Sequence, residues 1–408
     1  MSKDPLDELL QDPDRDNIPG AAPVIAYDPH QDGPEFLAAI TERASKRTRL
    51  TRRGRDHGHF VVLNDEEAPL FDADSALKRW RSARPTVLKG SFEEAIPKAT
   101  AGVELFQSLS EEPDLAAWSA QAELPGGLCP KHSQASFEDP ERDLSKLIFT
   151  DPSEALGSAW AKLARLSTHP DDESLRLRIG FGQEGLDDAS PILERQRLIS
   201  ELGKALLPGM EEICANRRVN SLLSKALKGP ALLTQPLAYW NRPEGGALFH
   251  HDAFGENSPA GQRGVLYVQT HGETLWLALS IDDLVTRVSE MTDAMILGDL
   301  REIRESLYPN DGLEPLLPIL RDEELLREEL GQPGCGKLSS LVNLGPSFTA
   351  WLADSGHACL LSPGDGILLP NHGVHHTCMH SVFCMSDHTT YAISMAIRLD
   401  EEPRTGSR

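Results

Sequence analysis

From residue 232 the sequence changes to short strand-like segments, and this change constrains the fold more than any other feature. Gly, Pro and Asn separate four short segments with the character of strands: LLTQPLAYWNR (232–242), ALFHHDAF (247–254), GVLYVQTHG (264–272) and TLWLALS (274–280). Short segments bounded by such turn residues are typical of strands, and short turns between consecutive strands favour antiparallel pairing. We therefore expect an antiparallel β core.

A helical pattern interrupts this β region. Val288, Met291 and Met295 belong to an apolar series at helical spacing that begins at residue 284 and ends at about 335. Strand patterns then return in ACLLSPGDGILLPNHGVHHTCM (358–379) and TTYAISMAIRL (389–399). The helical block is therefore interpreted as an insertion within one β domain that spans residues 231–400.

The chain before this domain is predicted to be mixed. Residues 1–35 are rich in Asp, Pro and Gly and are expected to form a flexible arm, and 401–408 a flexible tail. Residues 36–230 are interpreted as a mainly helical region with strands that lead into the barrel. Helical spacing predicts helices over 34–47, 73–83, 153–167 and 190–213, whereas 84–92 and 174–182 alternate as strands do.

Charge and cysteine content indicate which kinds of partner the protein can bind and in which cellular compartment it is expected. The formal net charge of −23 among 408 residues argues against nucleic acid as a partner, because it repels a phosphate backbone. The basic segment 46–55 is interpreted as a solvated linker rather than a nuclear address or an anion-binding strip. Scattered cysteines, no secretory pattern and no stretch long enough to cross a bilayer predict a cytoplasmic protein, and a homo-oligomer is compatible with the sequence.

The segment ALFHHDAF suggests half of a metal site. Alternate side chains of a strand point to one face, so His250 and Asp252 project together while His251 points away. The segment NHGVHHTCM offers a further ligand, and of the neighbours His375 and His376 only one is expected to face the metal. Two histidines and one carboxylate are the donor set of many Fe(II) sites with open positions. The competing interpretation is a set of hydrogen-bonded core histidines.

Four segments, in this order, resemble the JmjC and cupin-like 2-oxoglutarate-dependent oxygenases. They are RPTVLKG (84–90), LAYWNRPEGGALFHHDAF (237–254), LYVQTHGETLWLAL (266–279) and LSPGDGILLPNHGVHHT (361–377). The resemblance implies an α+β protein with a mainly β core, a double-stranded β-helix of the jelly-roll or cupin type. It also implies N-terminal helices and a helical insertion between the H-x-D strand and the strand of the distal histidine.

The resemblance also implies site residues and cofactors. Fe(II) would be held by His250, Asp252 and His375, with His376 as the alternative distal ligand, and 2-oxoglutarate and O2 would be co-substrates. The lysine that binds 2-oxoglutarate in many relatives is replaced by Thr274. The groups expected near the co-substrate are Arg398, Thr274, Tyr239 and Tyr391. Those expected in the substrate pocket are Trp240, Phe254 and Trp276, unless these aromatic residues are simply part of the core.

The activity implied is hydroxylation, or demethylation through hydroxylation, of a protein, peptide or small molecule. Because Thr274 departs from the family pattern, a metal-dependent cupin enzyme that does not use 2-oxoglutarate is a second interpretation. A non-catalytic JmjC-like interaction protein, which keeps the barrel and binds through its helical insertion, is a third.

Overall fold

The computed structural model describes ten stretches of the chain: residues 47–53, 55–61, 73–132, 139–150, 158–181, 192–253, 261–298, 300–308, 312–344 and 346–401. The predicted arm at 1–35, nearly all of the helix expected over 34–47, and residues 402–408 of the predicted tail lie outside these stretches. Phe254, predicted to line the substrate pocket, lies outside them as well.

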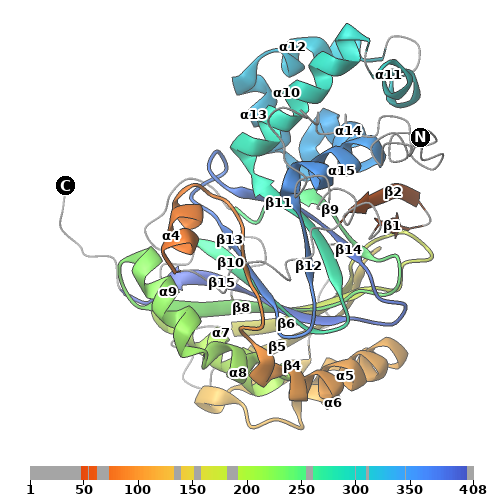
Figure 1. Cartoon of the computed structure of the whole chain (residues 1–408). Coiled ribbons are helices and arrows are strands. Elements are labelled where there is room, and N and C mark those ends of the chain that lie inside the picture. Colours follow the sequence, from red (N-terminus) through yellow and green to blue (C-terminus); the bar gives the residue numbers. More distant parts are fainter. Residues whose placement is uncertain are drawn as a thin grey trace, which may run out of the picture.

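Two antiparallel sheets face each other at the centre of the described structure (Figure 1). The larger sheet has nine strands in the order β3 (Thr86–Leu88), β13 (Gly366–Pro370), β10 (Gly264–His271), β15 (Tyr391–Leu399), β8 (Ala231–Trp240), β7 (Leu175–Phe181), β6 (Ser158–Arg165), β5 (Asp143–Thr150) and β4 (Cys129–His132). The smaller sheet has four, in the order β12 (Ala358–Leu361), β11 (Thr274–Ser280), β14 (Cys378–Cys384) and β9 (Gly246–His250).

The strands from β8 to β15 exchange between the two sheets. Strands β8, β10, β13 and β15 belong to the larger sheet, and β9, β11, β12 and β14 to the smaller one. Two packed antiparallel sheets connected in this way form a jelly roll. The predicted antiparallel β core is therefore confirmed, and its cavity lies between the sheets.

Period-two alternation explains how each sheet is covered on both faces. On β11, Leu275 and Leu277 pack outward with the helices that follow the strand, while Trp276 points between the sheets. On β15, Ile393 packs outward in the same way and Ala392 points inward. Strands with one face toward helices and the other toward a cavity need apolar residues on both sides, as observed.

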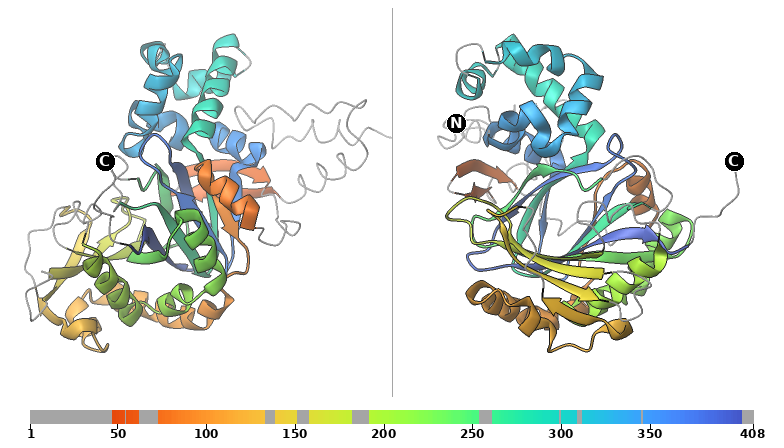
Figure 2. Two further views of the ribbon diagram at one scale, coloured as in Figure 1. Left: turned by 90° about the vertical axis from the view of Figure 1, so that its left-hand side faces the viewer. Right: turned by 180° about the vertical axis from the view of Figure 1, so that it is seen from behind.

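Helices in the first half of the chain cover the outer face of the larger sheet (Figures 1 and 2). Their bounds are α4 (Ala73–Arg81), α5 (Ala99–Glu111), α6 (Leu115–Ser119), α7 (Leu193–Leu206), α8 (Met210–Cys214) and α9 (Arg217–Leu227), with short 3-10 turns η2 (Glu93–Lys98) and η3 (Pro125–Gly127). The helix predicted over 190–213 is divided, because Pro208 separates α7 from α8.

The helix predicted over 153–167 is wrong. Residues 158–165 form strand β6, which pairs with β5 on one side and β7 on the other, with Trp160 opposite Gly180. Alanine and leucine give this segment a helical propensity, but two neighbouring strands provide a hydrogen-bonded ladder on both edges, and tertiary pairing overrides the local preference.

Between β11 and β12 the chain is helical and covers the outer face of the smaller sheet (Figure 2). The α-helices are α10 (Ile281–Leu297), α11 (Arg301–Leu307), α12 (Leu317–Leu320), α13 (Glu323–Leu330), α14 (Ser339–Leu344) and α15 (Pro346–Leu352), joined by η5 (Glu314–Leu316), η6 (Pro333–Leu338) and the π-helical η7 (Ala353–His357). Their apolar faces share one core with Phe249, Leu275 and Phe383 of the sheet.

The interpretation of 46–55 as a solvated linker is wrong, because its described residues belong to a separate hairpin in which Arg52 is buried. The hairpin, β1 (Arg47–Arg52) and β2 (Arg55–Val61), lies beside β14 and α15. Arg53 joins it to the turn before β9, since its backbone N–H donates to the carbonyl of Glu244 at 2.9 Å. The hairpin thus reaches the edge of the smaller sheet where the candidate ligands lie.

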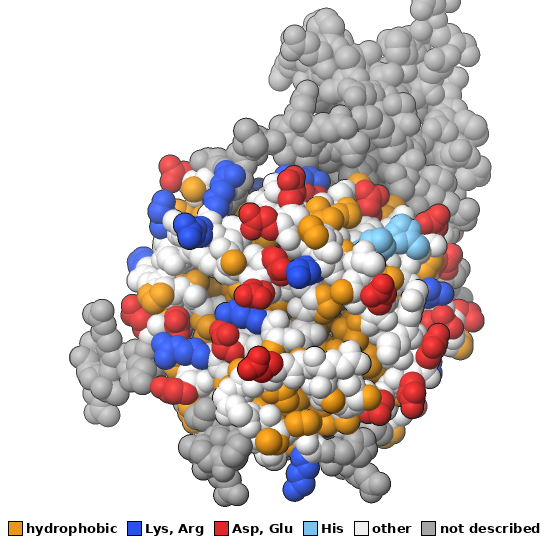
Figure 3. Space-filling view, turned by 90° about the horizontal axis from the view of Figure 1, so that it is seen from below, with side chains coloured by type: hydrophobic (Ala, Val, Ile, Leu, Met, Phe, Trp, Pro, Cys, Tyr) orange, Lys and Arg blue, Asp and Glu red, His pale blue; other side chains and the backbone are white. Residues whose placement is uncertain are grey.

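The surface and helices give two further observations. Figure 3 shows that acidic and basic side chains are interspersed on the lower face of the described residues, without a continuous basic area. Within those residues, no helix has both the length and the apolar character that crossing a bilayer requires.

Trp240 provides a test of this packing. It is fully buried on the helix-covered face, stacks on Tyr391 at 5.7 Å between ring centroids, and donates from Nε1 to the Gly102 carbonyl at 2.8 Å. We expect Trp240→Ala to lower the free energy of unfolding by about 3–5 kcal/mol, because it leaves a large cavity, and Trp240→Phe to cost less. Urea denaturation measures both. Equal stability of Trp240→Ala and the wild type would contradict this packing.

Candidate metal centre

His250 ends β9, and Asp252 follows two residues later. The strand lies close to β14 because Gly246 has φ 141°, and a Cβ there would collide with the carbonyl oxygen of Val382. Glycine is therefore needed for this approach. Phe249, which directly precedes His250, is fixed from outside, since its N–H donates to Asn343 Oδ1 of α14 at 2.7 Å.

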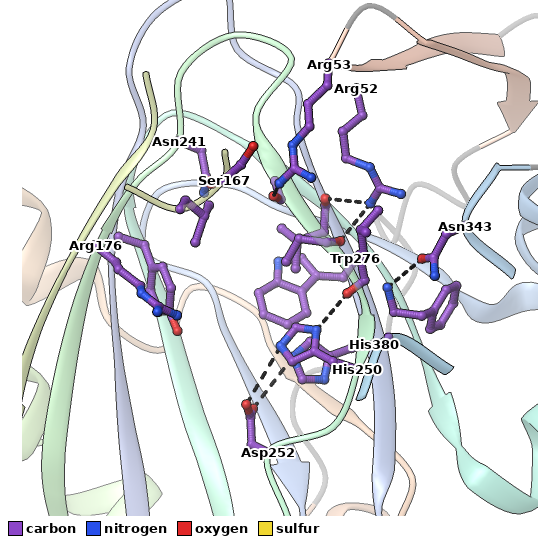
Figure 4. A pocket seen from close by; sticks show the side chains of 18 of the residues that line it. Arg52, Arg53, Ser167, Arg176, Asn241, His250, Asp252, Trp276, Asn343 and His380 are labelled. Atoms are coloured by element: carbon purple, nitrogen blue, oxygen red, sulfur yellow. Dashed lines mark hydrogen bonds and ion pairs between the residues drawn. The ribbon is translucent and has the colours of Figure 1, made fainter. Parts of the chain in front are cut away.

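His380 completes a cluster with this pair. It lies on β14 directly opposite His250 in the antiparallel register, and the two imidazole centroids are 4.2 Å apart. Asp252 Oδ1 is 3.8 Å from Nε2 of His250, and Oδ2 is 3.7 Å from Nε2 of His380. One donor atom from each residue lies within 4.8 Å of the others (Figure 4).

These separations fit a shared metal ion. Distances of 3.7 and 3.8 Å are too long for direct hydrogen bonds between Asp252 and the imidazoles. They suit donor atoms that each lie about 2 Å from one ion. The three donors are two nitrogens and one carboxylate, which is the set that leaves open positions on Fe(II).

The protonation of both histidines supports coordination. Burial, together with the neighbouring His250, lowers the pKa of His380 to about 3, so this imidazole is neutral near pH 7 and has a lone pair to donate. His250 Nδ1 lies 2.7 Å from the carbonyl oxygen of Leu248, to which it donates its proton. Nε2 of His250 is thereby left as the ligand atom, oriented by this hydrogen bond.

His251 faces away from the cluster, as its odd place in the strand predicts. Its Nε2 donates to the carbonyl of Gly331 at 2.9 Å, and its Nδ1 accepts from the backbone N–H of Ala253 at 3.1 Å. It therefore joins the metal-site strand to the helical region and is not a ligand candidate.

The structure does not bring His375, or its alternative His376, into this cluster. Both lie in the loop between β13 and β14, which Asn371 and Thr377 close by pairing and by a side-chain hydrogen bond. His375 is exposed, and His376 Nε2 donates to a backbone carbonyl at the end of α4 at 3.1 Å. The loop delays the start of β14, so the histidine that faces the pair is His380, five residues later.

A cavity of about 820 Å³ between the sheets opens beside the cluster. Of the predicted residues that are described, Tyr239 and Trp276 line it, together with the three ligand candidates. Trp276 stacks on the His380 ring at 5.3 Å and meets Tyr267 edge-on at 4.6 Å. This volume exceeds the need of one small dicarboxylate and leaves room for a second ligand.

Thr274 has a positioning role at this cavity. It is fully buried, donates from Oγ1 to Gln269 Oε1 at 2.9 Å, and accepts from Trp276 Nε1 at 3.1 Å. It does not line the cavity itself. Thr274, predicted to contact the co-substrate, is therefore not placed to do so. It acts on the cavity indirectly, because it fixes the orientation of Trp276.

Three further predicted residues lie away from the cavity. Trp240 and Tyr391 stack together in the outer core, where Tyr391 donates its hydroxyl to the Pro208 carbonyl at 3.0 Å. Arg398 is buried and donates to Gln235 Oε1 at 3.1 Å. Alternation along β8 and β15 sends Trp240 and Tyr391 to the face opposite the cavity, so neither contacts a ligand there.

Two functional candidates were missed by the sequence reasoning. His380 lies in CMHSVFC, a strand buried on both faces, and nothing in this pattern marks a metal ligand. Only the strand register, which places His380 opposite His250, identifies it as a candidate. Arg176 lies in SLRLRIG, where alternation places arginine on one face of β7. It is opposite Tyr239 of β8 in the strand register, and both residues line the cavity. Arginine on the inner face of a sheet was the available signal.

Fold and site together define a jelly-roll protein with a candidate three-residue metal centre. No protein-family model and no curated protein matches the sequence. Solved structures that it resembles include AviO1 from Streptomyces viridochromogenes Tue57, at 10% identity over 82% of this chain and 98% of that chain, with a TM-score of 0.32.

Two further solved structures cover the same share of this chain, 82%. The non-heme alpha ketoglutarate dependent epimerase SnoN from nogalamycin biosynthesis is 11% identical over 91% of its length, with a TM-score of 0.33. The ribosomal oxygenase YcfD from Escherichia coli is 13% identical over 52% of its length, with a TM-score of 0.27.

The ligand assignment predicts a contrast between two histidine variants. His380→Ala removes one of three donors, and we expect it to weaken Fe(II) or Co(II) binding by more than about tenfold. His375→Ala, in an exposed loop of the same connection, is the matched control and should bind as the wild type does. Titration followed by metal analysis measures both. The opposite order of affinities would restore His375 as the ligand.

Proposed function

We propose that this protein is an Fe(II)- and 2-oxoglutarate-dependent oxygenase that hydroxylates its substrate, with demethylation through hydroxylation as a variant. The observation that carries the proposal is the convergence of His250, Asp252 and His380 in the wall of the jelly-roll cavity. These three residues would hold Fe(II), which with 2-oxoglutarate and O2 would supply the oxidising power for hydroxylation of a C–H bond.

The protein's own residues orient the reactants and exclude water. The antiparallel pairing of β9 and β14 holds the two imidazoles in place, and Trp276 covers the His380 ring. Apolar side chains, among them Val265 and Leu369, line the neighbouring cavity wall. A rigid wall of this kind fixes the target carbon near the metal and keeps bulk water from it.

Arg176 and Tyr239 are assigned to the distal carboxylate of 2-oxoglutarate. A dicarboxylate in a cavity needs a cation or several hydroxyl donors. Arg176 is half-buried on the inner face, and among the described residues it forms no side-chain hydrogen bond or ion pair. Burial raises the pKa of Tyr239, so its hydroxyl stays protonated and can donate. This pair takes the place that the sequence reasoning gave to Arg398 and Tyr391.

The substrate is proposed to be a protein, a peptide or a small molecule. The excess of acidic residues, with a net charge of −23, disfavours nucleic acid. The cavity beside the metal centre has space for a substituent as well as for the co-substrate.

Succinate formation tests the activity. Protein purified without oxygen and supplied with Fe(II), 2-oxoglutarate and O2 should form succinate above a His250→Ala control, since this variant lacks one imidazole donor. 2-Oxoglutarate should also produce a charge-transfer absorption band with the bound Fe(II). Metal binding without that band or succinate would instead indicate a metal-dependent cupin, and absence of metal binding would indicate an interaction protein.

Arg176 generates a separate prediction. We expect Arg176→Gln to raise the KM for 2-oxoglutarate by about tenfold or more, because a charged hydrogen bond to the carboxylate is lost, while Fe(II) affinity stays unchanged. Arg178→Gln is the matched control, since Arg178 lies two residues along β7, over the Trp160 ring and outside the cavity lining. Equal KM values for Arg176→Gln and the control would contradict the assignment.

A further inference from the structure

Arg52, the last residue of β1, is a buried positive charge beside the candidate metal centre. It is 3% exposed and lines the same cavity as His250 and His380. Figure 4 shows Arg52 and Arg53 at the end of the cavity away from Asp252. The cation therefore comes from the N-terminal hairpin and not from the jelly roll.

Neutral groups hold the Arg52 guanidinium. Its Nη1 donates to the carbonyl oxygens of Ala247 and Val382, at 2.7 and 3.3 Å, and to Ser381 Oγ at 2.7 Å. The guanidinium also lies over the Phe383 ring, 4.2 Å from the centroid. All three hydrogen bonds use Nη1, so Nη2 and Nε make none with the described residues.

No carboxylate among the described residues compensates this charge. The adjacent Arg53 is paired with Asp172, at 3.0 Å between Nε and Oδ2, but Arg52 has no such partner. Burial, and then repulsion from Arg53, lower the pKa of Arg52 to about 9. A buried cation without a counter-ion is unfavourable, and a bound anion removes that cost.

The strand register fixes the distance from this cation to the metal centre. Ala247 and Val382 are paired across β9 and β14, and His250 and His380 are paired further along the same two strands. Val382 is two residues from His380, which corresponds to about 7 Å along a strand. An anion bound to Arg52 would therefore lie close enough to the metal ligands for one small substrate molecule to reach both.

We propose that Arg52 binds an anionic group of the substrate, a carboxylate or a phosphate, through Nη2 and Nε. This inference rests on the proposed function and adds a substrate class to it. The free edge of the guanidinium has the two parallel donors that match a carboxylate or phosphate. In this scheme Arg176, on the β7 side of the cavity, binds the carboxylate of 2-oxoglutarate, and Arg52 binds the anionic group of the substrate.

Anionic and neutral probes that share a phenyl ring test the proposal. Benzoate and phenyl phosphate, against benzamide as the neutral probe, are titrated into the full chain by ligand-observed NMR, with and without saturating 2-oxoglutarate. We expect the anionic probes to bind, benzamide to bind much more weakly, and 2-oxoglutarate not to displace them. The relative affinities of benzoate and phenyl phosphate distinguish a carboxylate from a phosphate substrate.

Arginine variants locate the site. Arg52→Met should weaken anionic-probe binding by about tenfold or more, and Arg52→Lys should weaken it less because the charge remains. Arg84→Met is the matched control, since it removes one positive charge from an exposed pair with Asp283. Thermal unfolding checks that Arg52→Met is folded, and if it is not, Arg52→Lys and Arg52→Gln provide the comparison.

The possible results separate the two proposals. The role of Arg52 would be overturned if folded Arg52 variants bound the anionic probes with wild-type affinity. It would also be overturned if 2-oxoglutarate displaced the probes and Arg176→Gln abolished their binding. Probe binding that depends on Arg52 in a protein that binds no 2-oxoglutarate would leave this inference standing and refute the oxygenase proposal alone.

Discussion

The pairing of β9 with β14 is the interaction on which the rest of the site depends. The backbone ladder places His250 opposite His380 although 130 positions separate them in the sequence, and Gly246 permits the close approach at the other end of the pair. Because each histidine is fixed by a strand buried on its outer face, the donor geometry is set by the fold before any ion binds.

Much of the fold and half of the site followed from the sequence for simple physical reasons. Short strand-like segments separated by turn residues predicted the antiparallel β core, and period-two alternation predicted that His250 and Asp252 share a side while His251 does not. These are local properties of one strand. They do not depend on loop lengths or on the partner strand, so the sequence alone predicts them.

The remaining site residues depended on long-range register and on which face is the interior. The loop closed by Asn371 and Thr377 delays β14, so the register of that strand brings His380, and not His375, opposite His250. Alternation likewise separates Trp240 from Tyr239 on β8, but it does not say which side meets helices and which meets the cavity. Only the packing of the two layers decides that.

The candidate donors and the two arginines assigned to anions, Arg52 and Arg176, have different origins along the chain. All three donors lie after residue 249, whereas Arg52 and Arg176 come from the hairpin and from β7, before the first jelly-roll strand. If the proposals above hold, exchange or divergence of the N-terminal part can alter which anions are bound while leaving the three candidate metal ligands unchanged. Reactivity and selectivity in such an architecture are free to evolve at separate rates.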